Sequence, residues 1–221
     1  MQKIWWPLVT GKHPPCRIDH LTVTAASLEA GVAWVSAQLG VPLQPGGEHV
    51  LMGTHNRLLR LGPRCYLEVI APAPHLAAPE RPRWFALDDP AMATPALRAW
   101  VARSVEIEAA AARLQGEVGT VCAMSRGDLL WQISIPEDGR MPWGGVLPML
   151  IEWPEGIHPA ERLPDQGVRL LGLHWSHPQA SAVQALLDTL PLQDACLQAD
   201  TPEAMPRLRA RVLTPAGERW L

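Results

Sequence analysis

The spacing of apolar residues predicts a strand, a helix and three further strands in the first third of the chain. Residues 17–24 alternate in side-chain character, as a strand does. A helix begins after the N-cap Ser27 and stops at Gly40, with one apolar stripe formed by Leu28, Val32, Val35 and Leu39. Strand-like runs then occupy residues 49–52, 56–61 and 65–71.

The same order of elements returns further along the chain. Residues 97–103 are strand-like, and a helix after Ser104 carries Ile107, Ala111 and Leu114 on one face. Three more strand-like runs cover residues 118–124, 129–135 and 146–153. A shortened copy closes the chain, with a strand over 167–175, a helix from Pro178 with Val183, Leu187 and Leu190, and strands over 195–198 and 208–213. This repetition predicts a sheet assembled from duplicated modules.

The repeats divide the chain into five parts. We expect an N-terminal extension (1–16), a first module (17–72), a linker (73–96), a second module (97–154) and a truncated third module packed on the same domain (155–221). Proline and alanine dominate the linker, which favours a surface connection. Trp84 and Phe85 leave a second interpretation open, because aromatic residues in a loop can cover the mouth of a pocket.

Composition indicates a globular protein with ample material for a core. The chain has 221 residues, of which 48% are hydrophobic, and a net charge of -3. It has no cluster of Lys and Arg, which argues against nucleic-acid and anionic-membrane partners. No apolar stretch approaches the ~20 residues that span a bilayer. Residues 1–16 lack the apolar core of a signal peptide, so we expect a cytoplasmic protein.

Several common kinds of site are absent from the sequence. The four cysteines are scattered without a C-x-x-C pair, so they indicate no zinc ribbon or disulfide framework. There is no G-x-S-x-G turn, phosphate-binding loop or dinucleotide fingerprint. The sequence therefore does not suggest a serine hydrolase or a nucleotide-binding protein.

Two strand-like runs each carry one potential metal ligand. Alternation sets His20 on a face with Ile18 and Thr22, and Glu68 on a face with the residues two positions away. If the strands are neighbours in a curled sheet, an imidazole and a carboxylate can converge on one divalent ion. The structural alternative is a hydrogen-bonded core histidine and a Glu68 paired with Arg60 or Arg64.

Residues 53–56 form a polar break between two apolar runs. At the rim of a cavity, such a break can aim His55 and Asn56 at a substrate. It can equally be a turn whose side chains satisfy the backbone. Both interpretations stay open.

Four ordered segments carry a family resemblance: residues 18–21, 53–58, 66–72 and 147–153. Together they resemble the glyoxalase-like domain proteins of the vicinal oxygen chelate superfamily, over the range from Arg17 to Leu221. The resemblance implies an α+β fold in which duplicated βαβββ modules form curved mixed sheets around a cavity, with a truncated third module at the C-terminus.

The resemblance also implies a metal site at the first and last strands of the modules. Carried over by position, it assigns His20, Glu68 and Glu152 as ligands. The opening strand of the second module departs from the pattern, because residues 99–101 offer no ligand. One histidine and two carboxylates can hold Zn²⁺, Mn²⁺, Fe²⁺ or Mg²⁺ with waters at the remaining positions. No organic cofactor is expected.

The function that follows is a small-molecule enzyme of the lyase, isomerase or dioxygenase type. A divalent metal would chelate vicinal oxygens and stabilise an enolate or oxyanion, with Glu68 or Glu152 as catalytic proton carrier. The alternative is a metal-free protein that sequesters an apolar or aromatic ligand, since the chain has ten Trp against one Tyr and one Phe. A homodimer interface is a further possibility.

Overall fold

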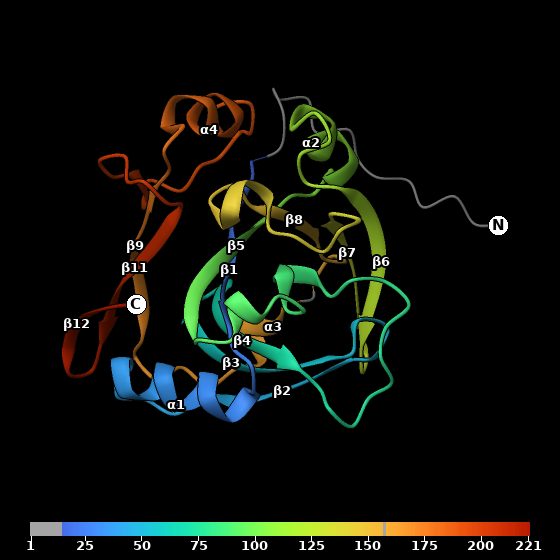
Figure 1. Cartoon of the computed structure of the whole chain (residues 1–221). Helices are drawn as coiled ribbons and strands as arrows, with labels where there is room; N and C mark the ends of the chain where they lie inside the picture. The colour runs from blue at the N-terminus through green and yellow to red at the C-terminus, as the bar shows by residue number, and fades with distance from the viewer. Residues whose placement is uncertain (1–14, 157) are drawn as a thin grey trace.

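The computed structural model describes residues 15–156 and 158–221. A curled eight-stranded sheet of order β2-β3-β4-β1-β5-β8-β7-β6 forms its main body (Figure 1). Its strands are β1 (Arg17–Thr24), β2 (Gln44–His49), β3 (Thr54–Gly62), β4 (Cys65–Pro72), β5 (Ala96–Arg103), β6 (Thr120–Arg126), β7 (Leu129–Ile135) and β8 (Met149–Glu152).

The sheet consists of two copies of one unit. In the first copy, β1 pairs in parallel with β4, and α1 (Leu28–Leu39) lies between β1 and β2 in the chain. In the second, β5 pairs in parallel with β8, and α2 (Ile107–Arg113) lies between β5 and β6. An antiparallel pair of β1 and β5 joins the copies. The predicted α+β fold of duplicated βαβββ modules is therefore confirmed.

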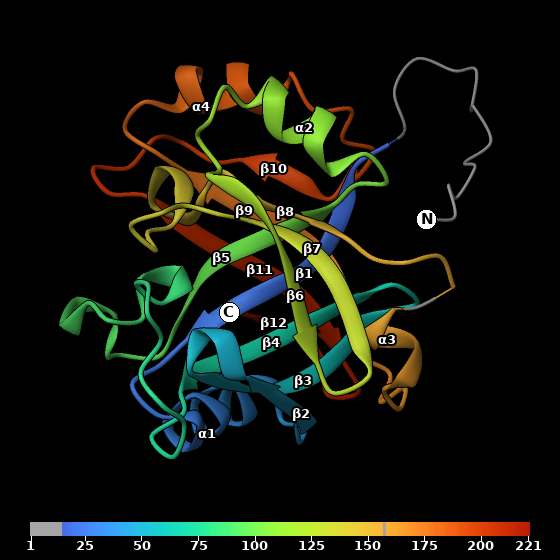
Figure 2. The ribbon, with the colours of Figure 1, turned by 90° about the vertical axis from the view of Figure 1, so that its right-hand side faces the viewer.

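A shortened third copy packs beside the main sheet, on its left in Figure 1 and behind it in Figure 2. It contains β9 (Arg169–Ser176), α4 (Ala180–Leu187), β10 (Leu197–Ala199), β11 (Arg207–Thr214) and β12 (Gly217–Trp220). These strands form a second sheet of order β10-β9-β11-β12. The short α3 (Pro159–Arg162) precedes it.

The first helix forms as its sequence predicts. The Ser27 side chain accepts a hydrogen bond from the amide of Ala30, and Gly40 ends the helix in the left-handed conformation with φ 70°. The third-module helix begins at Ala180, two residues later than predicted. No helix in the described part of the chain is long and apolar enough to cross a membrane.

The segment around His49 differs from its prediction. Residues 49–52 are not a strand: β2 ends at His49, and Val50–Met52 form the 3₁₀ turn η1. The preceding strand contains Gly46 and Gly47, which weaken its sequence signal. β12 was not expected from the sequence either.

The main sheet is covered on both faces. On its convex face, side chains such as Leu21, Leu67 and Trp100 form one apolar cluster with residues from the helices and the third module. A second cluster fills the concave face and includes Ile70, Val101, Met149, Ile151 and four large aromatic residues, Trp84, Phe85, Trp131 and Trp153. The candidate site lies in this second cluster.

The segment between the modules crosses the open side of the curled sheet (Figure 1). It contains two 3₁₀ turns, η2 (Trp84–Ala86) and η3 (Pro90–Met92). A further turn, η4 (Pro142–Gly145), precedes β8. The side chains of Trp84 and Phe85 are buried against the concave face, so this segment covers the site.

Candidate functional site

A bulge in β1 alters the alternation that the sequence predicts. Opposite β5, Ile18 pairs with Ala102 and His20 pairs with Val101, so Asp19 is an extra residue in β1. Ile18 consequently belongs to the convex cluster, whereas His20 lines the concave pocket. The expectation that these two residues share a face is therefore wrong.

Asp19 is fully buried and accepts hydrogen bonds from three side chains. Its Oδ1 lies 2.8 Å from Nδ1 of His20, and its Oδ2 lies 3.1 Å from Nε1 of Trp153 and 3.0 Å from Nε2 of His158. The amide of Ala160 donates to Nδ1 of His158, so Nε2 of that ring carries the proton that faces Asp19. The guanidinium of Arg103 lies 3.5 Å away.

These donors keep Asp19 ionised. Burial alone would raise the pKa of Asp19, but the hydrogen bonds from His158 and His20 lower it below its usual value of 3.8. An ionised carboxylate only accepts hydrogen bonds, so Nδ1 of His20 carries a proton. With a proton on Nδ1, the neutral form of a histidine has a free lone pair on Nε2 and can act as a base there. Tyr66 supports this ring by stacking, with the centroids 4.6 Å apart.

Glu68 faces that base from β4. Its Oε2 lies 3.7 Å from Nε2 of His20. Its Oε1 accepts a hydrogen bond of 2.5 Å from the side-chain amide nitrogen, Nδ2, of Asn56. The two arginines proposed as partners of Glu68 bind elsewhere. Arg60 donates to the carbonyls of Gly62 and Leu163, and Arg64 forms an ion pair with Glu161. At 3.7 Å, Nε2 of His20 and Oε2 of Glu68 are too far apart for a hydrogen bond, so both are left to interact with a bound molecule.

Both residues open into a narrow pocket. The free space is about 20 Å³, room for about one water molecule. Its wall is formed by His20, His49, Tyr66, Glu68, Trp84, Phe85, Arg126, Trp131, Ile133, Ile151 and Trp153. A larger ligand must therefore displace part of this wall.

His49 lies in the pocket wall without having been identified from the sequence. Its Nδ1 lies 3.1 Å from Oγ1 of Thr54, and its ring meets Trp84 edge-on at 5.0 Å. Burial lowers the pKa of His49 well below 6.5, with a further contribution from the charge of Arg126. His49 is therefore neutral. His49 ends a strand that contains Gly46 and Gly47, so the sequence there lacks the alternation of apolar and polar residues that marks the face of a strand.

Glu152 is not brought to His20 and Glu68. Met149 and Ile151 of β8 belong to the concave cluster and Leu150 to the convex cluster, so alternation turns Glu152 to the convex side. There Oε2 of Glu152 accepts a hydrogen bond of 2.8 Å from the amide of Ile107, the first residue of α2. The expected set of three ligands is thus not assembled.

No other side chain completes that set. In residues 15–156 and 158–221, no group of three or more His, Cys, Asp or Glu side chains is arranged to hold a metal ion. His20 and Glu68 supply one nitrogen and one oxygen, which is fewer than the protein donors of a typical catalytic zinc site.

Of the two residues predicted from the polar break at residues 53–56, Asn56 lies at the site and His55 does not. Asn56 is buried, and besides its bond to Glu68 it accepts a hydrogen bond from the amide of Gly47. His55 points to the opposite face of β3, where its ring lies 5.8 Å from that of His75.

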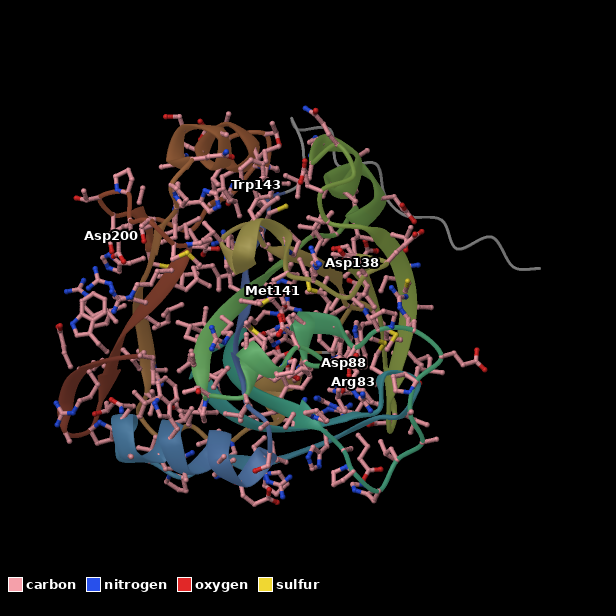
Figure 3. The ribbon with its side chains drawn as sticks, viewed as in Figure 1. Arg83, Asp88, Asp138, Met141, Trp143 and Asp200 are labelled. Atoms are coloured by element: carbon pink, nitrogen blue, oxygen red, sulfur yellow. The ribbon has the colours of Figure 1, made fainter. Side chains whose placement is uncertain are left out.

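The covering turn is fixed by an ion pair. Arg83 and Asp88 lie side by side (Figure 3), with NH1 of the guanidinium 2.6 Å from Oδ1 of the carboxylate. The amide of Ala86 donates to the carbonyl of Gly139. Between these anchors, Phe85 and Ala86 have positive φ angles of 55° and 52°. Residues other than glycine adopt such angles at a cost of about 1–2 kcal/mol each.

Comparison with known proteins agrees with this architecture. The family described as "Glyoxalase-like domain" matches residues 18–190. No curated protein matches the sequence. A hypothetical protein from Staphylococcus aureus has a similar structure, with a TM-score of 0.56 and 15% identity over 93% of this chain and 84% of that one. That similarity concerns the fold alone.

Two methylmalonyl-CoA epimerase structures are more distantly similar. The enzyme from Mycobacterium tuberculosis has a TM-score of 0.41 and 23% identity over 62% of this chain and 87% of its own. A methylmalonyl-CoA epimerase in complex with methylmalonyl-CoA and NH4+ has a TM-score of 0.44 and 18% identity, over 66% of this chain and 100% of its own.

Proposed function

The chain belongs to the glyoxalase-like domain family, and from that premise we propose that it is an enzyme that moves a proton on a small, oxygen-bearing organic molecule. His20 is the proton carrier, Asp19 orients it, and Glu68 is its partner across the pocket. The substrate is a carbonyl compound with an acidic C–H bond, whose proton a neutral imidazole can remove.

One observation carries this proposal. The Nδ1 proton of His20 is held by an ionised, fully buried carboxylate, and the free Nε2 lies 3.7 Å from Oε2 of Glu68 inside the pocket. A histidine oriented in this way has a defined tautomer, and its protonated form is stabilised by the anion behind it.

A base and a carboxyl group that face the same pocket suit proton transfer in both directions. When Nε2 of His20 takes a proton from carbon, the positive charge that develops is balanced by Asp19 at 2.8 Å. Glu68, in its protonated form, can return a proton to the carbon. Asn56 keeps the carboxyl group in place through its hydrogen bond to Oε1.

The metal implied by the superfamily resemblance does not fit this donor set. His20 and Glu68 are two donors, and the carboxylate expected as the third, Glu152, caps a helix on the other face of the sheet. We therefore assign the proton transfer to the side chains themselves.

Exchange of carbon-bound hydrogen tests the proposal. Pyruvate and hydroxyacetone are incubated with the protein in D₂O, and proton NMR follows the loss of the C–H signals. The wild type should accelerate exchange, and His20→Asn should reduce the acceleration by about 100-fold or more. His75→Asn, which alters an exposed histidine, is the matched control. Equal exchange by the wild type and His20→Asn would contradict the proposal.

The pocket wall also favours a second candidate, a protein that sequesters a small aromatic molecule. Trp84, Phe85, Trp131, Trp153 and Tyr66 present aromatic surfaces to one small space. Such a protein would bind indole or phenol with saturation and would not accelerate exchange. Exchange that depends on His20 would argue against it.

A further inference from the structure

The two edges of the curled sheet meet at one side of the pocket. β2 and β6 are the terminal strands of the sheet order, and no strand pairing joins them in the described residues. Arg126, the last residue of β6, packs on Gly47 of β2: a Cβ at position 47 would lie 2.8 Å from Cγ and Cδ of Arg126. We call this contact the seam. Only a residue without a side chain leaves room for Arg126 at the seam.

Arg126 stands between two spaces. On one side is the narrow pocket of His20 and Glu68. On the other is an open groove of about 650 Å³, formed by residues 45–48, 126–129 and the region of α3. Arg126 is the one residue that the linings of the two spaces have in common among the described residues.

The positive charge of Arg126 has no partner within the described part of the chain. No hydrogen bond or ion pair of its side chain occurs there, whereas the other charged groups along the groove are paired. Arg162 binds Asp128 through two hydrogen bonds of 3.0 and 2.9 Å, and Glu48 binds His75 at 2.7 Å.

The pocket also contains unused hydrogen-bond donors. The indole N–H groups of Trp84 and Trp131 are buried and have no acceptor, although both residues line the pocket. Only 3% of Trp84 and 6% of Trp131 are exposed, so bulk water does not satisfy them. A buried donor without an acceptor is costly and calls for an explanation. Glu68 lines the same pocket, but neither indole N–H donates a hydrogen bond to it.

We infer that the substrate is an organic acid whose carboxylate binds Arg126 and the indole N–H groups of Trp84 and Trp131. This inference rests on the proposed function, since it names the substrate class of the same site. A planar guanidinium and two fixed N–H donors match the two oxygens of a carboxylate. The acidic C–H bond of that acid would then lie toward Nε2 of His20.

Binding of small carboxylates and their neutral amides tests this inference. The probes are acetate and pyruvate, compared with acetamide and pyruvamide, and the indole N–H signals of ¹⁵N-labelled protein report binding. Trp84→Phe and Trp131→Phe assign the two signals. We expect the carboxylates to shift both signals and to bind about tenfold or more tightly than the amides.

Arg126→Gln should abolish the preference for the carboxylate. Arg162→Gln is the matched control, because it removes a paired arginine from the same groove and should leave the preference unchanged. Equal affinity for acid and amide, equal effects of the two substitutions, or no carboxylate binding at all would each overturn the inference. If Arg126→Gln does not fold, Arg126→Lys, which keeps the charge but loses the planar fork, should weaken binding by several-fold.

Different results would contradict the proposed proton transfer and the inferred carboxylate binding. Carboxylate binding that depends on Arg126 but occurs without His20-dependent exchange would contradict the proposed function and leave the binding inference standing. Exchange of hydroxyacetone that matches or exceeds that of pyruvate would contradict the carboxylate inference and leave the proposed function standing. His20→Asn should still bind acetate, because its side chain is not one of the inferred carboxylate ligands.

Discussion

Asp19 and His20 are consecutive residues of one strand, yet their side chains are joined by a hydrogen bond of 2.8 Å. Neighbouring residues of a regular strand point to opposite faces and cannot make this contact. The bulge opposite Ala102 and Val101 makes it possible. A single extra residue thus supplies both the orienting anion and the orientation of the base.

Replacing Asp19 with asparagine should change the tautomer of His20. An amide has one acceptor oxygen, and if that oxygen keeps the bonds from Trp153 and His158, its NH₂ group faces Nδ1 of His20. The ring must then carry its proton on Nε2 and can no longer act as a base there. We expect a loss of about 2–4 kcal/mol in the free energy of unfolding and about 100-fold slower exchange.

Nitrogen chemical shifts of the imidazole and urea unfolding check this prediction. Asp138→Asn is the control, because Asp138, labelled in Figure 3, forms an exposed ion pair with Arg140 and is not part of the pocket wall. An unchanged His20 tautomer in Asp19→Asn would refute the orienting role of Asp19.

Glu152→Gln should affect stability and leave the pocket unchanged. The carboxylate of Glu152 accepts from the first amide of α2, and the N-cap residue Glu106 gives no side-chain cap of its own. A neutral amide oxygen is a weaker cap, so we expect a loss of about 1 kcal/mol. Urea unfolding measures the loss, and hydrogen exchange of pyruvate should match the wild type. Loss of exchange at wild-type stability would show that Glu152 does act at the site.

Stability should fall as the pH drops below about 6.5. Burial holds the pKa of His49 well below 6.5, so the unfolded chain binds a proton at His49 that the folded chain does not. The free energy of unfolding therefore decreases as the pH falls, by up to about 1.4 kcal/mol per pH unit for this group. The lowered pKa of Asp19 acts at lower pH, since its stabilisation is lost only below about pH 4.

Urea unfolding between pH 7 and pH 5 tests the contribution of His49. His49→Asn should unfold with a weaker pH dependence than the wild type, and His75→Asn should keep the wild-type dependence. Identical slopes for His49→Asn and the wild type would show that His49 does not resist protonation in the folded chain.

Ala86→Gly should stabilise the turn that covers the pocket. Ala86 has a φ angle of 52°, which glycine adopts without strain. The relief exceeds the added flexibility of the unfolded chain, so we expect a gain of up to about 1 kcal/mol. Ala91→Gly, in the 3₁₀ turn η3 of the same segment, should instead cost about 0.5–1 kcal/mol. Thermal unfolding compares them, and a loss in both variants would contradict the prediction.

Much of the fold follows from the sequence because the modules repeat a strong periodic pattern. Ser27 and Gly40 bound the first helix as predicted, and Leu150 and Glu152 share one face of β8, as strand alternation requires. The sequence could not decide which face that is. Apolar residues cover the sheet on both faces, so neither side is marked as the inside.

The site was less predictable than the fold. His20 and Glu68 were named from their places in apolar strands and from the family resemblance, and both line the same pocket. Asp19 reaches Nδ1 of His20 only because of the bulge, and no rule of residue spacing predicts where a bulge occurs. Arg126 and His49 reach the pocket through contacts between distant strands, and Trp84 through a segment that resembles an ordinary linker.

The seam between β2 and β6 also sets how the molecule can deform. A closed barrel of strands can widen only if hydrogen bonds between strands break, whereas a curled sheet with two unpaired edge strands can widen by bending. Because no strand pairing joins β2 to β6 in the described residues, the side of the pocket at Arg126 can spread without the loss of a ladder hydrogen bond. Substitutions at this rim can therefore adjust the width of the pocket while His20 on β1 and Glu68 on β4, at the middle of the sheet, keep their geometry.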